Sequence, residues 1–167
     1  MASLWKLPVV YVIENNEYSM GTSTKRHAAG QFYRRGEGFN VPGEQVDGMD
    51  VEAVMAATEQ ALNYVREGNG PYILEMKTYR YRGHSMSDPG KYRTKDEVAS
   101  YKDEKDPIAR IKRLMIDELK IKEEDIKAID KDIKVIVNEA AQFAQDAPEP
   151  DASELWTDVL VSVEDVA

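Results

Sequence analysis

The sequence predicts an α/β fold in which a parallel sheet is flanked by helices. Residues 7–15, "LPVVYVIEN", form a continuous apolar run rich in β-branched and aromatic side chains. Residues 50–66 then change to a helical period, and a second strand-like run, "GPYILEMKTYRY", follows from residue 70. The order strand, connection, helix, strand favours a right-handed crossover between parallel strands.

The first run is typical of a strand buried on both faces of a parallel sheet, and it ends at Asn15. Residues 17–48 follow it. They contain many glycines and no sustained period, so they predict a long, partly irregular connection.

The helix expected from Asp50 onwards has an apolar face and a possible stop at Gly68. Its face recurs at helical spacing and consists of Val51, Val54, Met55, Thr58, Ala61, Leu62 and Val65. The second strand leads into a loop at residues 82–95, after which Asp106 and Pro107 occupy the preferred first positions of another helix, "DPIARIKRLMIDEL".

A last helix is predicted by an apolar stripe that stops before "DAPEPD". The stripe consists of Ile126, Ile129, Ile133, Ile136, Val137, Ala140 and Ala144. We expect it to pack on the domain's own core, although a helix of this kind can also face a partner. The tail "SELWTDVLVSV" predicts a short edge strand or a docking arm.

Length and composition set limits on the class of protein. The 167 residues suit one ordinary domain, 42% of them are hydrophobic, and the formal net charge is −9. Binding to nucleic acid is not expected, because phosphate neutralisation needs an excess of Lys and Arg. A membrane span is not expected either, since the N-terminal apolar run is interrupted by Lys6 and Pro8. The absence of cysteine fits a reducing compartment such as the cytosol or the mitochondrial matrix.

Two strands are too few for a stable parallel sheet, because such a sheet buries both faces. We therefore expect either that partner segments supply further strands or that the chain is one piece of a larger fold.

Polar residues follow the first strand at its carboxyl end, where open α/β sheets bind ligands. Asn16 offers a hard oxygen donor that suits magnesium, which usually shares its ligands with substrate phosphates. Asparagine is also a common turn former, so an ordinary polar turn is the alternative.

The loop "RYRGHSMSDP" contains His84, one of only two histidines in the chain. Histidine can exchange protons near neutrality, and Arg80, Arg82 and Asp88 are available to orient it. The alternative is an exposed histidine without a role. A serine-hydrolase triad of Ser85, His84 and Asp88 is disfavoured, because adjacent residues rarely form a triad. His27 lies in a polar stretch and is expected to be solvated.

Several segments occur here in an order that resembles the pyruvate dehydrogenase alpha-subunit family of thiamine-diphosphate-dependent 2-oxoacid dehydrogenases. These segments are "ENNEYSMGT", "VDGMD", "GPYILEMKTYRYRGHSMSDP", "YRT" and "AAQFAQDAPEP". The resemblance extends from Ala2 to about Val161. It implies thiamine diphosphate and magnesium as cofactors, pyruvate as substrate, and acetyl transfer to a lipoyl domain of the acyltransferase component. It also implies an alpha2beta2 heterotetramer with a beta subunit.

The resemblance assigns roles to individual residues. Asn16 and the carbonyl of Tyr18 match magnesium ligands, and His84 matches the active-site histidine of a regulated loop. Arg80 matches an arginine that helps to hold this loop. Asn16, Tyr18, Arg80 and Ser85 are thereby placed at the cofactor. Ser85 and Ser23 match serines that are phosphorylated in mitochondrial members, whereas "DPGKYRT" is one residue shorter than in the family and lacks the third such serine.

One family motif is absent. A Gly-Asp-Gly segment, whose aspartate binds magnesium in the family, does not occur in the sequence. We therefore expect the chain to correspond to the carboxyl half of the family subunit, with Met1 aligned to an internal methionine. The resemblance then implies that residues 1–105 are the carboxyl-terminal part of a thiamine-diphosphate-binding α/β domain, with the active-site loop at residues 80–95. It implies that residues 106–167 add helices and a tail that pack on the same domain. A catalytically silent interaction fragment, which pairs with a beta subunit but binds no cofactor alone, is the rival interpretation.

Overall fold

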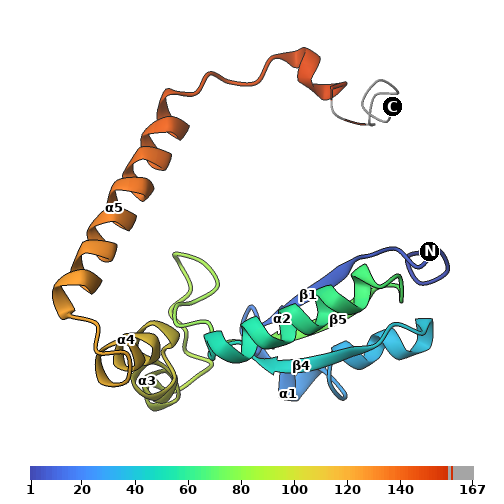
Figure 1. Ribbon diagram of the computed structural model, residues 1–167, viewed down its shortest axis with the longest axis horizontal. Helices are drawn as coiled ribbons and strands as arrows, with labels where there is room; N and C mark the ends of the chain where they lie inside the picture. The colour runs from blue at the N-terminus through green and yellow to red at the C-terminus, as the bar shows by residue number, and fades with distance from the viewer. Residues whose placement is uncertain (158, 160–167) are drawn as a thin grey trace. The chain divides into compact units, whose positions relative to one another are not determined.

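The computed structural model describes residues 1–157 and residue 159 of the chain. The chain divides into two compact units, residues 1–119 and residues 120–167, which are described separately below (Figure 1). The boundary expected after residue 105 rests on the family resemblance and stays a prediction.

The first unit is built on a three-stranded parallel sheet, and the strand that comes last in the sequence lies in the middle (Figure 1). The strands lie in the order β1 (Val10–Asn15), β5 (Tyr72–Lys77) and β4 (Gly43–Asp47). Val10 lies opposite Tyr72, and Gly43 lies opposite Ile73. The α/β class and both predicted strands are thus confirmed.

The expected irregular connection is wrong in part, because residues 17–48 contain several short elements. They are β2 (Tyr18–Ser19), β3 (Thr22–Ser23), α1 (Thr24–His27), the 3-10 helix η1 (Tyr33–Phe39) and β4. The sequence of β4, "GEQVD", has a single apolar residue and so shows no strand-like run. Gly43 is required there, since a Cβ atom would lie 2.6 Å from the Ile73 carbonyl oxygen.

The helix α2 (Val51–Arg66) covers one face of the sheet (Figure 1) and begins where the sequence predicts. The Asp50 carboxylate accepts hydrogen bonds from the backbone N–H groups of Glu52 and Ala53 and thereby caps the helix. The buried core between helix and sheet consists of Val46, Ala57, Ala61, Val65, Tyr72, Leu74 and Met76.

The predicted apolar face of α2 is only partly correct. Ala61 and Val65 are buried, whereas Val51 and Met55 are 39% and 67% exposed. The face turned to the sheet includes the small side chains of Ala61, as predicted, and of Ala57, which the predicted face left out. Small residues at this position let the helix backbone approach the sheet closely.

The expected burial of β1 on both faces is also wrong. Tyr11 and Val12 are 47% and 57% exposed. The physical reason is that β1 is an edge strand, and α2 packs mainly over β5 and β4. The apolar side chains of β1 are therefore only partly covered by the described residues of this chain.

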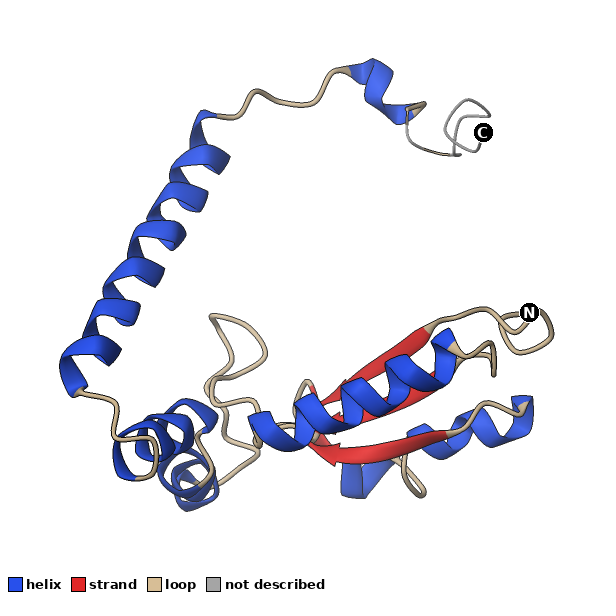
Figure 2. Ribbon diagram, viewed as in Figure 1, coloured by secondary structure: helices blue, strands red, loops and turns tan. Residues whose placement is uncertain are grey.

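Two further helices follow the loop at residues 78–94, which is drawn without regular structure in Figure 2. The helix α4 (Pro107–Asp117) is confirmed, with the Asp106 carboxylate accepting from the Ala109 N–H. The helix α3 (Lys95–Glu104) is additional. Its cap is Thr94, whose hydroxyl accepts from the Glu97 N–H. The spacing of Thr94 and Glu97 is a helix-start pattern that the sequence already contains.

The second unit contains α5 (Glu123–Asp146) and the short 3-10 helix η2 (Ala152–Leu155). The helix α5 confirms the prediction and ends at Asp146, the first residue of "DAPEPD". The expected burial of its stripe is confirmed only at Ile126, which is 7% exposed, and is wrong further along, because Ile129, Ile133 and Ile136 are all more than half exposed. Among the described residues of this unit, α5 is the only α-helix and no strand is present to cover its apolar side. The expected edge strand is replaced over residues 152–155 by η2, and the rest of that segment reaches beyond the described residues.

Candidate functional site

The turn after β1 presents the first group of candidate residues. Asn15 Oδ1 accepts a hydrogen bond from the Glu17 N–H at 3.1 Å, and Asn16 Oδ1 accepts one from the Tyr18 N–H at 3.1 Å. These two consecutive side-chain-to-backbone bonds define the turn. Glu17 has a φ of 70°, a left-handed conformation that is uncommon for a residue with a side chain. The turn therefore has one well-defined local geometry.

The loop after β5 carries the second group. Arg80 Nη1 lies 3.4 Å from His84 Nδ1, and Arg80 Nη2 donates to the Met20 carbonyl oxygen at 2.6 Å. The Arg80 side chain thus joins this loop to the segment that follows the Asn16 turn. Its Nε atom is buried and has no hydrogen-bond partner within residues 1–157.

The Asp88 carboxylate stabilises the part of the loop that contains His84. Its Oδ2 accepts from the His84 N–H and from the Tyr92 hydroxyl, each at 2.7 Å, and its Oδ1 accepts from the Gly90 N–H at 2.8 Å. The expectation that Asp88 orients the imidazole is therefore wrong, because this carboxylate binds the His84 backbone. A Cβ atom at Gly83 would lie 2.5 Å from the Asp88 carbonyl oxygen, so this close return of the chain requires glycine.

These hydrogen bonds also set the charge of the loop. The N–H of His84, the N–H of Gly90 and the Tyr92 hydroxyl hold the pKa of Asp88 well below its usual range, at about 2. A carboxylate that accepts several hydrogen bonds is favoured in its charged form. Asp88 is therefore the fixed negative charge of this loop at neutral pH.

The Arg93 guanidinium stabilises the backbone at the start of the loop. Its guanidinium donates to the carbonyl oxygens of Arg80, Tyr81 and Arg82, which are consecutive. The same group lies 5.7 Å from the ring centre of Tyr18, within the range of a cation–π contact. Arg82, which we expected to orient His84 by its side chain, thus takes part in the network through its carbonyl oxygen.

Tyrosines connect the turn, the loop and α3. The hydroxyl groups of Tyr18 and Tyr79 both donate to Glu97 Oε1, at 2.6 and 2.9 Å. Burial, and then the hydrogen bond to Glu97, raise the pKa of Tyr18 well above its usual value. The ring centres of Tyr18 and Tyr92 are 5.4 Å apart. Turn and loop are therefore held as one polar platform, defined here as residues 15–20 and 79–97.

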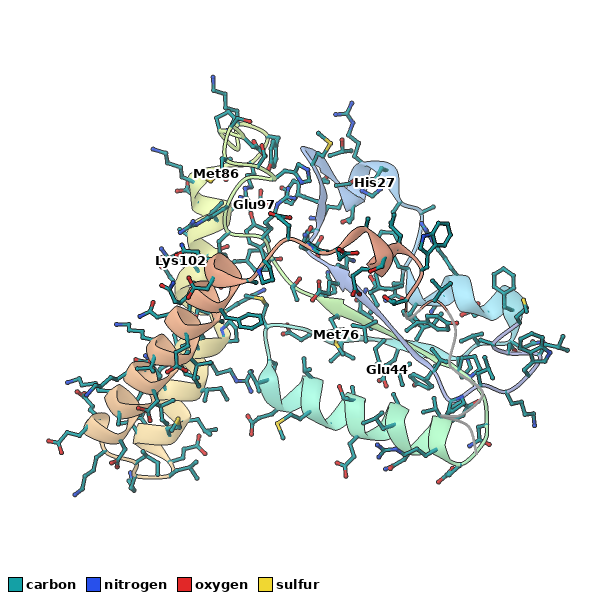
Figure 3. The ribbon with its side chains drawn as sticks, turned by 90° about the horizontal axis from the view of Figure 1, so that it is seen from above. His27, Glu44, Met76, Met86, Glu97 and Lys102 are labelled. Carbon is teal, nitrogen blue, oxygen red and sulfur yellow. The ribbon has the colours of Figure 1, made fainter. Side chains whose placement is uncertain are left out.

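The remaining candidates are the two serines Ser85 and Ser23 and the second histidine, His27. Ser85 is exposed, and its hydroxyl lies 3.1 Å from that of Ser87. Met86, at the tip of the loop, stands away from the sheet that carries Met76 (Figure 3). Ser23 pairs with Tyr18 across the β2–β3 hairpin. His27 is exposed in α1, as expected (Figure 3).

The donors at the Asn16 turn fit part of a magnesium site. Asn16 Oδ1 and the Tyr18 carbonyl are neutral hard oxygens, and one lone pair of the amide oxygen is already used by the Tyr18 N–H. The adjacent Glu17 carboxylate is engaged by Lys77 Nζ at 2.8 Å. Within the described residues, no group of three or more His, Cys, Asp or Glu side chains could hold a metal ion. A cation here would need further charged ligands.

Comparison with known sequences identifies the group of proteins to which this platform belongs. The dehydrogenase E1 component family matches residues 1–153. The chain belongs to this family. It is 56% identical over 162 residues to the pyruvate dehydrogenase E1 component subunit alpha of Rhizobium meliloti (strain 1021), covering 96% of this chain and 47% of that protein.

Two other relatives, both pyruvate dehydrogenase E1 component alpha subunits, differ in origin. The protein of Rickettsia typhi (strain Wilmington) is 52% identical over 162 residues, covering 96% of this chain and 49% of the relative. A mitochondrial protein of Dictyostelium discoideum is 50% identical over 163 residues, covering 96% and 43%. The chain spans about half the length of the curated relatives it matches.

Residues of this dehydrogenase E1 chain that sequence reasoning missed are Arg93, Tyr92, Glu97 and Tyr79. They act through contacts with backbone carbonyls or with one another, and no local motif marks such contacts. Tyr79, Tyr92 and Arg93 lie in segments that carry the family resemblance, which assigned them no role, and Glu97 lies three residues after the capping Thr94. No helix within the described residues combines the length and the apolar character that crossing a membrane requires.

Proposed function

We propose that this chain forms the carboxyl-terminal half of the alpha subunit of a pyruvate dehydrogenase E1 component. In this proposal it acts with a beta subunit in an alpha2beta2 heterotetramer, decarboxylates pyruvate and passes the acetyl group to a lipoyl domain. One observation carries the proposal. The Asn16 turn and the His84 loop converge through the bond from Arg80 to Met20, in a chain 56% identical to a protein of that description.

Thiamine diphosphate and magnesium are the proposed cofactors. When bound, thiamine diphosphate supplies an electron sink for the loss of carbon dioxide. Asn16 Oδ1 and the Tyr18 carbonyl would bind the magnesium ion, and the diphosphate would supply much of the charge that these two neutral oxygens lack. Arg80 and Ser85 would lie on the cofactor side of the loop, where the Arg80 guanidinium favours an anionic group.

His84 is the proposed catalytic residue. Its Nδ1 faces the Arg80 guanidinium, which has only donors, so the neutral imidazole carries its proton on Nε2. A proton-bearing Nε2 can orient the substrate carbonyl or move a proton during acetyl transfer. The His84 side chain is exposed at the surface of the loop and can therefore meet a group that a partner protein delivers.

The experiment is His84→Ala in the intact alpha subunit assembled with its beta subunit, with reductive acetylation of a lipoyl domain as the measurement. Loss of a positioned acid–base group should lower the rate by about 10²- to 10⁴-fold. His27→Ala is the matched control, because His27 is an exposed histidine of α1. An unchanged rate in His84→Ala would remove His84 from the mechanism.

A catalytically silent interaction fragment is the second candidate. It is favoured by the missing charged metal ligands within the described residues and by the half-length match to the relatives. Isothermal titration with magnesium and thiamine diphosphate, of the chain alone and of the full-length subunit with its amino-terminal half, separates the two candidates. We expect weak or no binding by the chain alone, because two neutral oxygens do not offset the dehydration of Mg²⁺. Saturable binding by the chain alone would defeat the fragment interpretation.

The compartment follows from the same proposal. The relatives named above include bacterial proteins and one described as mitochondrial. We accordingly propose the bacterial cytoplasm or the mitochondrial matrix. Immunolocalisation of the full-length subunit tests this assignment, and a secreted subunit would contradict it.

A further inference from the structure

The central strand β5 buries a carboxylate that the proposed chemistry does not use. Glu75 has no exposed surface, although its neighbours Leu74 and Met76 belong to the apolar core under α2. Side chains alternate along a strand, so Glu75 points to the opposite face of the sheet. Burying a charged group is costly unless its hydrogen bonds are satisfied, so its partners indicate what it does.

All partners of Glu75 are N–H donors from two other segments. Its Oε1 accepts from Asn15 Nδ2 at 2.7 Å. Its Oε2 accepts from the backbone N–H groups of Phe32 and Tyr33, at 2.8 and 3.2 Å, where η1 begins. One carboxylate thus connects β5, the end of β1 and the first turn of η1.

The bond to Asn15 has a consequence for the adjacent turn. A carboxamide has one donor end and one acceptor end, so Glu75 determines which end of Asn15 faces which way. With Nδ2 turned to Glu75, Oδ1 is directed at the Glu17 N–H and accepts from it at 3.1 Å. This bond helps to stabilise Glu17 in its left-handed conformation. Asn16 and Tyr18 lie on either side of Glu17.

We infer that Glu75 is a positioning residue for the metal-binding turn. It acts through Asn15 on the path of residues 15–18 and thereby sets where Asn16 Oδ1 and the Tyr18 carbonyl lie. The inference rests on the proposed function, since it assumes that these two oxygens bind the magnesium of a bound diphosphate. Residues that orient metal ligands through hydrogen bonds commonly govern metal affinity in this way.

The substitution Glu75→Gln tests the inference because it keeps the shape of the side chain and replaces one acceptor by a donor. The new amide must place its NH₂ group against either the Asn15 amide or the η1 N–H groups. The Asn15 carboxamide could avoid a clash of two donors by rotating through 180°. This rotation would turn its NH₂ group toward the Glu17 N–H. We expect the Kd for Mg²⁺, titrated with thiamine diphosphate into the intact alpha/beta assembly, to rise about tenfold or more.

A double variant should restore the hydrogen bond between residues 15 and 75, with the donor and the acceptor exchanged. In Asn15→Asp with Glu75→Gln, the new amide donates to the new carboxylate and accepts from the N–H groups of Phe32 and Tyr33. The other carboxylate oxygen accepts from the Glu17 N–H, and the net charge is unchanged. We expect Mg²⁺ affinity to return close to the wild-type value. Recovery of this kind is not expected if Glu75 only contributes to general stability.

Two controls complete the experiment. Leu74→Ala weakens the same strand without touching the network and should leave the Kd of the folded assembly unchanged. Asn16→Ala removes the proposed ligand itself and should weaken binding. If Asn16→Ala weakens binding and Glu75→Gln does not, the positioning role is wrong while the proposed function stands. If neither does, the metal assignment of the proposed function fails, and this inference fails with it.

If Glu75→Gln does not assemble, Asn15→Ala replaces it, because Glu75 then keeps its two backbone donors. Loss of the Asn15 oxygen should raise the Kd for Mg²⁺ about tenfold. An unchanged Kd in Asn15→Ala, or a double variant that binds as weakly as Glu75→Gln, overturns the inference.

Discussion

The core under α2 and the polar platform beside it are held together by different forces. Ala61, Val65 and Leu74 are almost without exposed surface, so the core is stabilised by apolar burial, which has no direction. The platform exposes His84 and is held by directional hydrogen bonds from Arg93 and to Asp88. Such a loop can open locally while the sheet stays folded. The difference suits a scaffold that carries the loop of the proposed catalytic residue His84.

The largest expected effect is on the core. Leu74→Ala leaves a cavity between β5 and α2 and should lower the free energy of unfolding by about 2–5 kcal/mol. Urea denaturation of the assembled subunit, followed by circular dichroism, measures it. Glu59→Ala on the exposed side of α2 is the control and should stay within about 0.5 kcal/mol of wild type. Equal effects of both substitutions would contradict the assigned core.

The platform should respond to Arg93→Lys without loss of the core. Lysine keeps the charge but lacks the planar fork that reaches three consecutive carbonyl oxygens. We expect local opening of residues 80–92 to become easier by about 2–3 kcal/mol. Hydrogen exchange of these amides should accelerate, while exchange in β5 stays slow. Lys91→Ala is the control, since Lys91 is exposed in the same loop. Unchanged exchange in Arg93→Lys would show that Arg93 does not fasten the loop.

A smaller effect is expected from pH through Asp88. Its pKa in the folded loop is about 2, below its ordinary value of 3.8, so the stabilisation is fully present above about pH 4. It is lost as the pH falls from there through 2. Exchange protection of the His84 and Gly90 amides, relative to β5, should follow this course. Asp88→Asn should show low protection across the whole range. Loss of protection above about pH 5 in wild type would contradict the role of Asp88.

The predictable part of the fold is the part with local signals. The apolar runs of β1 and β5, the helical period after Asp50 and the cap Asp106 predicted their elements correctly. The strand β4 has only Val46 as an apolar residue, so its place at the sheet edge is set by pairing with β5. Burial was harder to predict than elements, because the sequence of β1 and α5 shows apolar faces but not what covers them.

The residues of the candidate site also divide into those that a local sequence motif marks and those that only the tertiary fold brings together. Asn16, Tyr18, Arg80 and His84 lie in motifs, and their proximity follows from parallel strands that end at one edge of the sheet. Arg93 and Glu75 lie outside any motif that chemistry alone would mark. Arg93 binds backbone carbonyls, and Glu75 interrupts an apolar run and looks like an exposed position. Their partners are fixed only by the tertiary fold.

The central claim is that the turn at residues 15–18 carries part of a magnesium and thiamine diphosphate site. The most direct measurement is the affinity of the intact alpha/beta assembly for Mg²⁺ at saturating thiamine diphosphate, in wild type and in Asn16→Ala. Our account predicts saturable binding by wild type and a rise of the Kd by about 10- to 100-fold in the variant. Equal affinities of the two proteins would contradict it.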